Sequence, residues 1–222
     1  MKTLRSLLAL LLLSCSSATH SLKQNETIVF LGDSITQLGV QPKGYVTIIK
    51  ESLLQHHPSA TVIGAGISGN KVPDLRERLE RDVLAKQPTI VFIYIGINDV
   101  WHSILPGRSG TPKDQFGAGL RELIGKIQHA GARVILCTPT VIGEKKDGAN
   151  RLDAQLDDYA AVSRRVAAET GSQLCDLRKT FIDYLKSHNL ENNDRGILTR
   201  DAVHLNDDGN MLVAREMLGL LK

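Results

Sequence analysis

The chain has 222 residues, and its 27 Lys and Arg residues nearly balance its 24 Asp and Glu residues. This balance, with no basic run or aromatic-studded basic patch, argues against a nucleic-acid partner. The length suits one domain with a substantial core, and neither repeats nor low-complexity tracts divide it.

The first residues have the pattern of an export signal. Lys2 and Arg5 precede the apolar run Leu7 to Leu13, and small residues follow it. The run is too short to span a bilayer, which needs about 20 apolar residues. We therefore expect residues 1–18 to be a signal peptide and the mature protein to be periplasmic or extracellular. Its removal leaves 25 basic against 24 acidic residues.

Two kinds of cleavage fit the end of this signal. The small residues from Ser16 to Ala18 suit a general signal peptidase. The run Leu12 to Cys15 instead resembles a bacterial lipobox, in which the cysteine is lipidated and becomes the first residue. Leu13 fits poorly because a smaller residue is usual there, but lipidation would explain a cysteine directly after the apolar run. We expect membrane attachment only through this anchor.

Short apolar runs alternate with longer amphipathic ones across a single domain of residues 26–222. We expect strands at 28–31, 61–63, 89–95, 133–137 and 173–176. We expect helices at about 44–56, 72–86, 113–130, 152–170, 179–187 and 207–221. This alternation predicts an α/β fold, a three-layer α/β/α sandwich around a five-stranded parallel sheet. Ligands of such sheets bind beyond the carboxyl ends of the strands.

A serine follows the first expected strand, in Gly32-Asp33-Ser34. Gly32 allows a tight turn there, which would expose the Ser34 hydroxyl at the edge of the sheet. Asp or Ser at this point also commonly caps the following helix. The pattern differs from the nucleophile elbow G-x-S-x-G, because Thr36 stands in place of its second glycine.

A glycine motif follows the second expected strand. The run Gly64-Ala65-Gly66-Ile67-Ser68-Gly69 matches G-x-G-x-x-G, the dinucleotide-binding fingerprint. Its context argues against nicotinamide or flavin, because it does not open the first βαβ unit and the acidic candidates Glu80 and Asp82 lie inside a helix. We therefore expect no cofactor. Gly69 would instead let its backbone N–H approach a ligand closely.

Two further polar motifs follow the third strand and precede the last helix. Asn98, in Gly96-Ile97-Asn98-Asp99, could donate its amide to a developing alkoxide or merely satisfy loop backbone groups. The carboxylate of Asp201 is close enough in sequence to bind the Nδ1–H of His204. The Nε2 atom would then be free to take a proton from a serine. A surface histidine beside a helix is the alternative for His204.

Two segments without regular pattern, 101–112 and 189–200, are expected to form the rims of a pocket. Trp101 offers a large apolar face for a sugar ring or a short acyl group, or else it anchors its loop to the sheet. We expect Trp101 and Asp33 to contact substrate. Cys137 and Cys175 are expected to be buried thiols, and no Cys/His spacing predicts a metal site.

Together these motifs resemble the SGNH, or GDSL, hydrolase family over nearly the whole mature chain. The resemblance implies a catalytic triad of Ser34, Asp201 and His204. It implies an oxyanion hole formed by the backbone N–H of Ser34 with Gly69 and Asn98. It also implies that the five parallel strands follow a flavodoxin-like order.

The expected function is that of a serine esterase that works through an acyl-enzyme. Its expected substrates are small acyl esters, including O-acetyl groups on carbohydrates, on family analogy and the exported location. A lysophospholipase or thioesterase and an O-acyltransferase are the enzymatic alternatives. An exported carbohydrate-binding protein on an inactive hydrolase fold is the non-catalytic alternative, and the intact motifs argue against it.

Overall fold

The computed structural model describes residues 22–221. Its centre is a parallel sheet of five strands in the order β2-β1-β3-β4-β5, the flavodoxin-like order. The strands are β1 (Thr27–Gly32), β2 (Thr61–Gly66), β3 (Ile90–Tyr94), β4 (Arg133–Cys137) and β5 (Gln173–Cys175). The expected signal peptide, with Cys15, lies outside the described residues.

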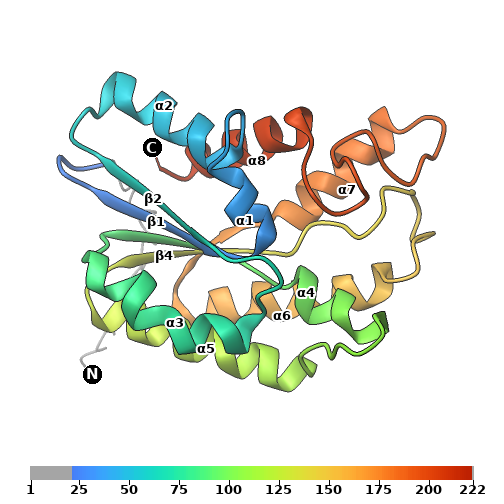
Figure 1. The fold of residues 1–222 in the computed structure, drawn as a ribbon, viewed down its shortest axis with the longest axis horizontal. Helices are drawn as coiled ribbons and strands as arrows, with labels where there is room; N and C mark the ends of the chain where they lie inside the picture. The colour runs from blue at the N-terminus through green and yellow to red at the C-terminus, as the bar shows by residue number, and fades with distance from the viewer. Residues whose placement is uncertain (1–21, 222) are drawn as a thin grey trace, which may run out of the picture.

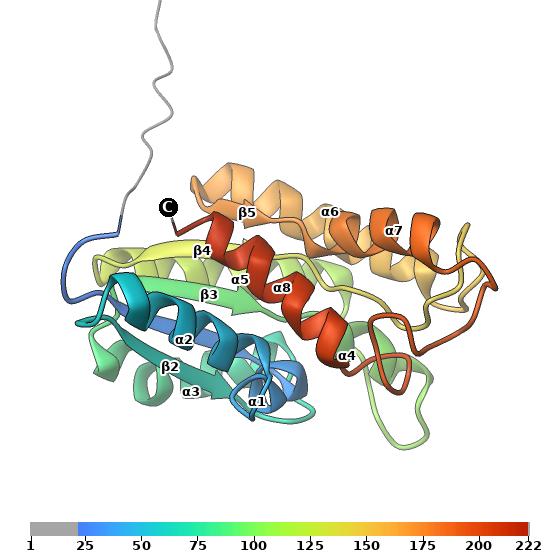
Figure 2. The same cartoon turned by 90° about the horizontal axis from the view of Figure 1, so that it is seen from above.

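Helices cover both faces of the sheet, as Figures 1 and 2 show. One face carries α2 (Tyr45–His56), α7 (Leu177–His188) and α8 (Asp207–Gly219). The other face carries α3 (Val72–Asp82), α5 (Lys113–His129) and α6 (Asp153–Thr170). The predicted three-layer α/β/α sandwich is confirmed.

The burial of each strand follows its place in the sheet. Every residue of the central strand β3 is buried, as its continuous apolar run predicts for a strand covered on both faces. The edge strand β2 is partly exposed and continues three residues beyond its expected end, because 64–66 pair with 30–32 of β1. A Cβ added at Gly66 would lie 2.1 Å from the backbone nitrogen of Gln37, so the close approach of the chain there requires glycine.

Two short helices that are not among the expected helix ranges follow strands. They are α1 (Ser34–Gly39), after β1, and α4 (Ile97–Trp101), after β3. Short 3₁₀ helices follow α3 at Leu84–Lys86 and α4 at His102–Ile104. The two α-helices place Ser34 and Asn98 in their first turns, so the motifs begin helices that are too short for hydrophobic periodicity to reveal.

Two further expectations concern the cysteines and the membrane. Cys137 and Cys175 are buried free thiols, as predicted. The two residues are opposite each other in the register of β4 and β5. Between residues 22 and 221, no helix combines the length and apolar character needed to cross a bilayer.

Candidate active site

A chain of hydrogen bonds joins Ser34, His204 and Asp201 beyond the carboxyl end of the sheet. Ser34 begins α1 directly after β1, whereas Asp201 and His204 come from the loop before α8. The Nε2 atom of His204 lies 3.0 Å from the Ser34 Oγ, and its Nδ1 atom lies 2.8 Å from the Asp201 Oδ2. The structure thus brings together the three residues that the sequence grouped as a triad.

The carboxylate of Asp201 fixes the orientation of the imidazole. Its Oδ1 accepts the backbone N–H groups of His204 at 2.7 Å and Val203 at 3.2 Å. Partial burial acts to raise the pKa of Asp201, but the hydrogen bonds from the backbone and ring of His204 outweigh it and hold that pKa below its ordinary value. An ionised carboxylate at Nδ1 leaves Nε2 as the acceptor for the Ser34 hydroxyl.

The turn between the two residues is strained. Ala202 has a φ of +75°, in the left-handed region that residues with a side chain rarely adopt. Its carbonyl accepts the backbone N–H of Gly143 at 2.8 Å, from the loop after β4. Such strain persists only where surrounding contacts determine the conformation, and it is common at functional sites.

The three groups that the sequence suggests for an oxyanion hole each keep a hydrogen-bond donor without a close acceptor among the described residues. Ser34 is in the first turn of α1, where backbone N–H groups have no acceptor within the helix. Gly69, in the loop after β2, has a φ of +78°, and none of the residues that the structure describes accepts its N–H. The Nδ2 of Asn98 donates to the carbonyl of Asn70 at 3.1 Å and contacts the Asp33 Oδ2 at 3.5 Å. The second of these contacts is long, so one amide hydrogen is available for an oxyanion.

Asp33 lies behind the serine and is only 2% exposed. Its Oδ1 caps α1 by accepting the N–H of Ile35 at 2.9 Å, and its Oδ2 faces Asn98. Burial raises the pKa of Asp33 to about 7, the Ile35 hydrogen bond opposes this shift, and the nearby charge of Asp99 adds to it. This placement favours a supporting role for Asp33 over the contact with substrate expected from the sequence.

The segment after α4 borders the donors. Trp101 is half-buried and packs against the core, which favours the anchoring role among the two considered for it. The guanidinium of Arg108 lies 3.0 Å from the His102 Nε2, and the Lys71 Nζ donates to the carbonyl of Ser109 at 2.9 Å. A Cβ added at Gly69 would lie 3.7 Å from the Arg108 Nη1. The loop therefore lies beside Gly69.

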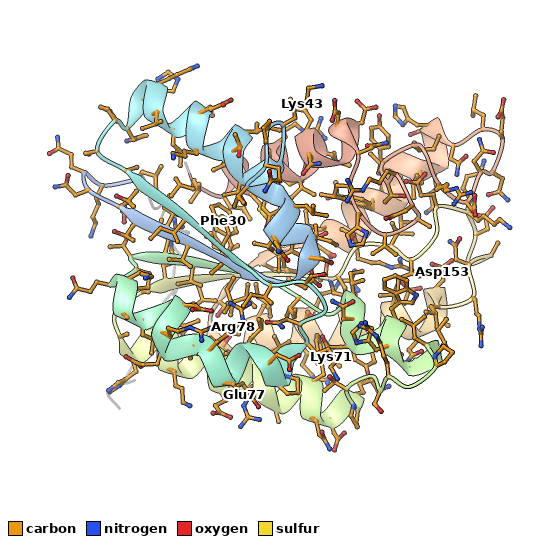
Figure 3. All side chains as sticks on the ribbon, viewed as in Figure 1. Phe30, Lys43, Lys71, Glu77, Arg78 and Asp153 are labelled. Carbon is orange, nitrogen blue, oxygen red and sulfur yellow. The ribbon has the colours of Figure 1, made fainter. Side chains whose placement is uncertain are left out.

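Arg78, which was not identified from the sequence, contacts the segments that carry the proposed oxyanion donors. It is 6% exposed and donates to the carbonyls of Gly32 at 2.8 Å and Ala65 at 3.0 Å, and to the Asn70 Oδ1 at 2.7 Å. In Figure 3 it lies on the side of α3 that faces the sheet, whereas Glu77 points away from it. Arg78 thus ties the ends of β1 and β2 to the residue that holds Asn98.

Two buried supporting residues, Arg78 and Glu144, were not identified from the sequence, which carried a weak signal only for Arg78. Arg78 falls on the apolar face of its helix beside Leu75 and Leu79, where a charge needs a buried partner. Glu144, fully buried in the loop after β4, has no such signal, because no periodic pattern surrounds it. Over residues 22–221, no group of three or more His, Cys, Asp or Glu side chains is arranged as a metal site.

Several proteins of similar sequence and fold are named as esterases. The model of the GDSL-like lipase/acylhydrolase family matches residues 30–212. The acetylxylan esterase of Geobacillus stearothermophilus is 35% identical over 210 residues, which cover 87% of this chain and 92% of that protein. The crystal structure of the acetyl xylan esterase AlAXEase has a TM-score of 0.86 and 45% identity, and covers 88% of this chain and 100% of that one.

Structures of Axe2, an acetylxylan esterase from Geobacillus stearothermophilus, are also similar. The crystal structure has a TM-score of 0.78 and 31% identity, covering 89% of this chain and 94% of that one. Three catalytic mutants of Axe2 replace a serine, an aspartate and a histidine by alanine, and their TM-scores are 0.79, 0.81 and 0.79. The replaced aspartate and histidine are three positions apart, as Asp201 and His204 are.

The fold and these similarities define the class of the protein, a carboxylic ester hydrolase with a flavodoxin-like sheet. The chain belongs to the GDSL-like lipase/acylhydrolase family.

Proposed function

We propose that the protein is an acetyl esterase in which Ser34 is the nucleophile, His204 the general base and acid, and Asp201 the group that orients His204. The observation that carries this proposal is the 3.0 Å contact between the Ser34 Oγ and the His204 Nε2. The contact is continued by the 2.8 Å contact between His204 and Asp201. A serine hydroxyl is a weak nucleophile until such a base removes its proton.

The reaction proceeds through an acyl-enzyme. As the Ser34 Oγ attacks the ester carbonyl, its proton passes to the His204 Nε2, and Asp201 stabilises the resulting imidazolium. The backbone N–H groups of Ser34 and Gly69 and the amide of Asn98 donate to the oxyanion of the tetrahedral intermediate. His204 then gives the proton to the departing alcohol. Water, activated by the same imidazole, releases the acid from Ser34.

Acetyl groups on carbohydrates are the proposed substrates. The similarity to acetylxylan esterases, over most of each chain, supports acetylated xylan or a related acetylated carbohydrate. We expect the enzyme to release acetate from acetylated xylooligosaccharides, and the Ser34→Ala variant to lose most of this activity. Hydrolysis of p-nitrophenyl acetate without release of acetate from any acetylated carbohydrate would contradict this choice of substrate.

We also propose that residues 1–18 export the protein. The pattern from Lys2 to Ala18 supports this, with lipidation at Cys15 or cleavage after Ala18 as the two outcomes. Fractionation of bacteria that express the full chain, followed by the intact mass of the mature protein, separates them. A lipid-modified Cys15 raises that mass, and Cys15→Ala abolishes the increase. A full-length chain confined to the cytosol would contradict export.

A further inference from the structure

The buried carboxylate of Glu144 forms hydrogen bonds with the segment that leads to Asp201. Glu144 is 0% exposed. Its Oε1 accepts the backbone N–H groups of Leu198 at 2.7 Å and Thr199 at 2.5 Å, and the Thr199 hydroxyl at 2.8 Å. Its Oε2 accepts the backbone N–H of Ile197 at 2.7 Å. Four donors from three consecutive residues thus converge on one side chain.

The backbone around Glu144 holds the same segment at further points. Gly143 donates its N–H to the carbonyl of Ala202 at 2.8 Å. Ala202 lies between Asp201, which we propose orients the imidazole, and His204, which we propose transfers the proton. The N–H of Glu144 donates to the carbonyl of Asp194 at 2.9 Å, and the Asn189 amide donates to the Glu144 carbonyl at 2.8 Å. The loop after β4 therefore forms hydrogen bonds with the chain both before and after Asp201.

The other hydrogen bonds of residues 197–199 are internal to the segment: the N–H of Gly196 donates to the Thr199 carbonyl at 2.8 Å, and that of Asn206 donates to the Leu198 carbonyl at 3.0 Å. Residues 189–206 form turns and bends without a helix or strand, apart from one bridge between Thr199 and Leu205. Glu144 makes no salt bridge with any residue between 22 and 221, so the converging N–H groups are what compensate its burial. Consecutive backbone N–H groups that enclose an anion hold it and are held by it.

We propose that Glu144 is a positioning residue for catalysis, which sets the distance between the His204 Nε2 and the Ser34 Oγ by fixing residues 197–199. It touches neither the substrate nor the reacting atoms, and the inference rests on the proposed triad. Asp201 follows Thr199 by two residues, so a displaced Thr199 displaces the carboxylate that orients His204. A misplacement of about 1 Å at a reacting group can lower a rate by about 10²-fold.

The Glu144→Gln variant tests this role, because it keeps the shape of the side chain but turns one acceptor into a donor that opposes the backbone N–H groups. We expect its kcat for p-nitrophenyl acetate to fall by roughly 10- to 100-fold, with KM changed by less than about 2-fold. Labelling of Ser34 by a fluorophosphonate should slow in parallel. The far-downfield proton resonance of the His204 Nδ1–H should weaken or move.

A purely structural role would change none of these readouts in the folded enzyme. Leu123→Ala is the matched control for lost stability, because Leu123 lies on the buried face of α5, and α5 covers the face of the sheet opposite α8. All variants are assayed at a temperature at which circular dichroism shows them to be folded. A Glu144→Gln enzyme with a lowered melting temperature but the kcat of the wild type would overturn the inference.

Two further variants keep the result decisive. Thr199→Val removes only the hydroxyl donor and keeps the shape of the side chain, so we expect a smaller fall in kcat, of roughly 3- to 10-fold, even where Glu144→Gln does not fold. An unchanged kcat in Thr199→Val, with Glu144→Gln unfolded, would also overturn the inference. Ser34→Ala separates the two proposals, because an active Ser34→Ala enzyme contradicts the triad itself.

Discussion

At the scale of single residues, Asn98 is the side chain that we propose as an oxyanion donor. Its Nδ2 is held by the Asn70 carbonyl at 3.1 Å and only weakly by Asp33 at 3.5 Å, so one amide hydrogen is free to meet developing charge. We expect Asn98→Ala to lower kcat by roughly 10²- to 10³-fold with little change in KM, because the oxyanion exists only around the transition state. A change confined to KM, measured with p-nitrophenyl acetate, would mean that Asn98 binds substrate or shapes the loop.

The buried carboxyl of Asp33 links the site to stability. Its pKa in the folded protein is about 7, above the ordinary value of 3.8, chiefly because of burial. The folded state therefore binds this proton more tightly than the unfolded state does, so the free energy of unfolding falls as pH rises from about 4 to about 7. A shift of this size corresponds to at most on the order of 4 kcal/mol.

The Asp33→Asn variant removes this titration. We expect the free energy of unfolding of the wild type to decline relative to that of Asp33→Asn between about pH 4 and about pH 8. Urea unfolding at several pH values, followed by circular dichroism, measures the difference. Curves that run parallel over the whole range would show that Asp33 does not titrate there.

At the level of elements, we propose that the loop between α4 and α5 limits the space for the acyl group. His102 and Lys71 fix it at Arg108 and Ser109, beside Gly69, and Trp101 anchors its start against the core. We expect a steep preference for acetyl or propionyl esters over octanoyl and longer ones. Comparable kcat/KM values for C2 and C12 p-nitrophenyl esters, measured below micelle formation, would instead favour the lysophospholipase alternative.

The longer elements could be predicted from the sequence because each has a periodic pattern of its own. The apolar run of β3 and the amphipathic α3 are examples, and the strand order followed from the family resemblance. The short helices α1 and α4 have no room for a period. The extension of β2 depends on pairing with β1, which no local pattern records.

The candidate site divides in the same way. Its reactive groups lie in motifs whose residue types and spacing suggest chemistry, as Asp201 and His204 do. Its supports, Arg78 and Glu144, act through carbonyls and N–H groups that are distant in sequence. A contact that forms only between segments brought together by the fold leaves no local trace, so sequence reasoning could not find Glu144.

Over the whole fold, the parallel arrangement of the strands explains why segments far apart in the sequence meet at the site. Ser34 and His204 are 170 positions apart, yet the start of α1, after β1, and the segment before α8 meet at the same end of the sheet. Figure 1 shows the loops after the strands and the segment before α8 gathered there, away from the amino end of β1. The proposed site therefore depends on segments that are far apart in the sequence.

If Ser34 and His204 act as one catalytic unit, removal of both should lower the activity little more than removal of either one. We expect Ser34→Ala and His204→Ala each to abolish most of the esterase activity, and the double variant to lose little more. Initial rates with p-nitrophenyl acetate measure the three variants. Independent, multiplicative losses would contradict a joint role.

Labelling with a fluorophosphonate, followed by peptide mass spectrometry, addresses the nucleophile itself. We predict a single adduct on Ser34 of the wild type, no adduct in Ser34→Ala, and much slower labelling in His204→Ala because the hydroxyl then lacks its base. An adduct on a different serine, or undiminished labelling of His204→Ala, would contradict Ser34 and His204 as the reacting pair.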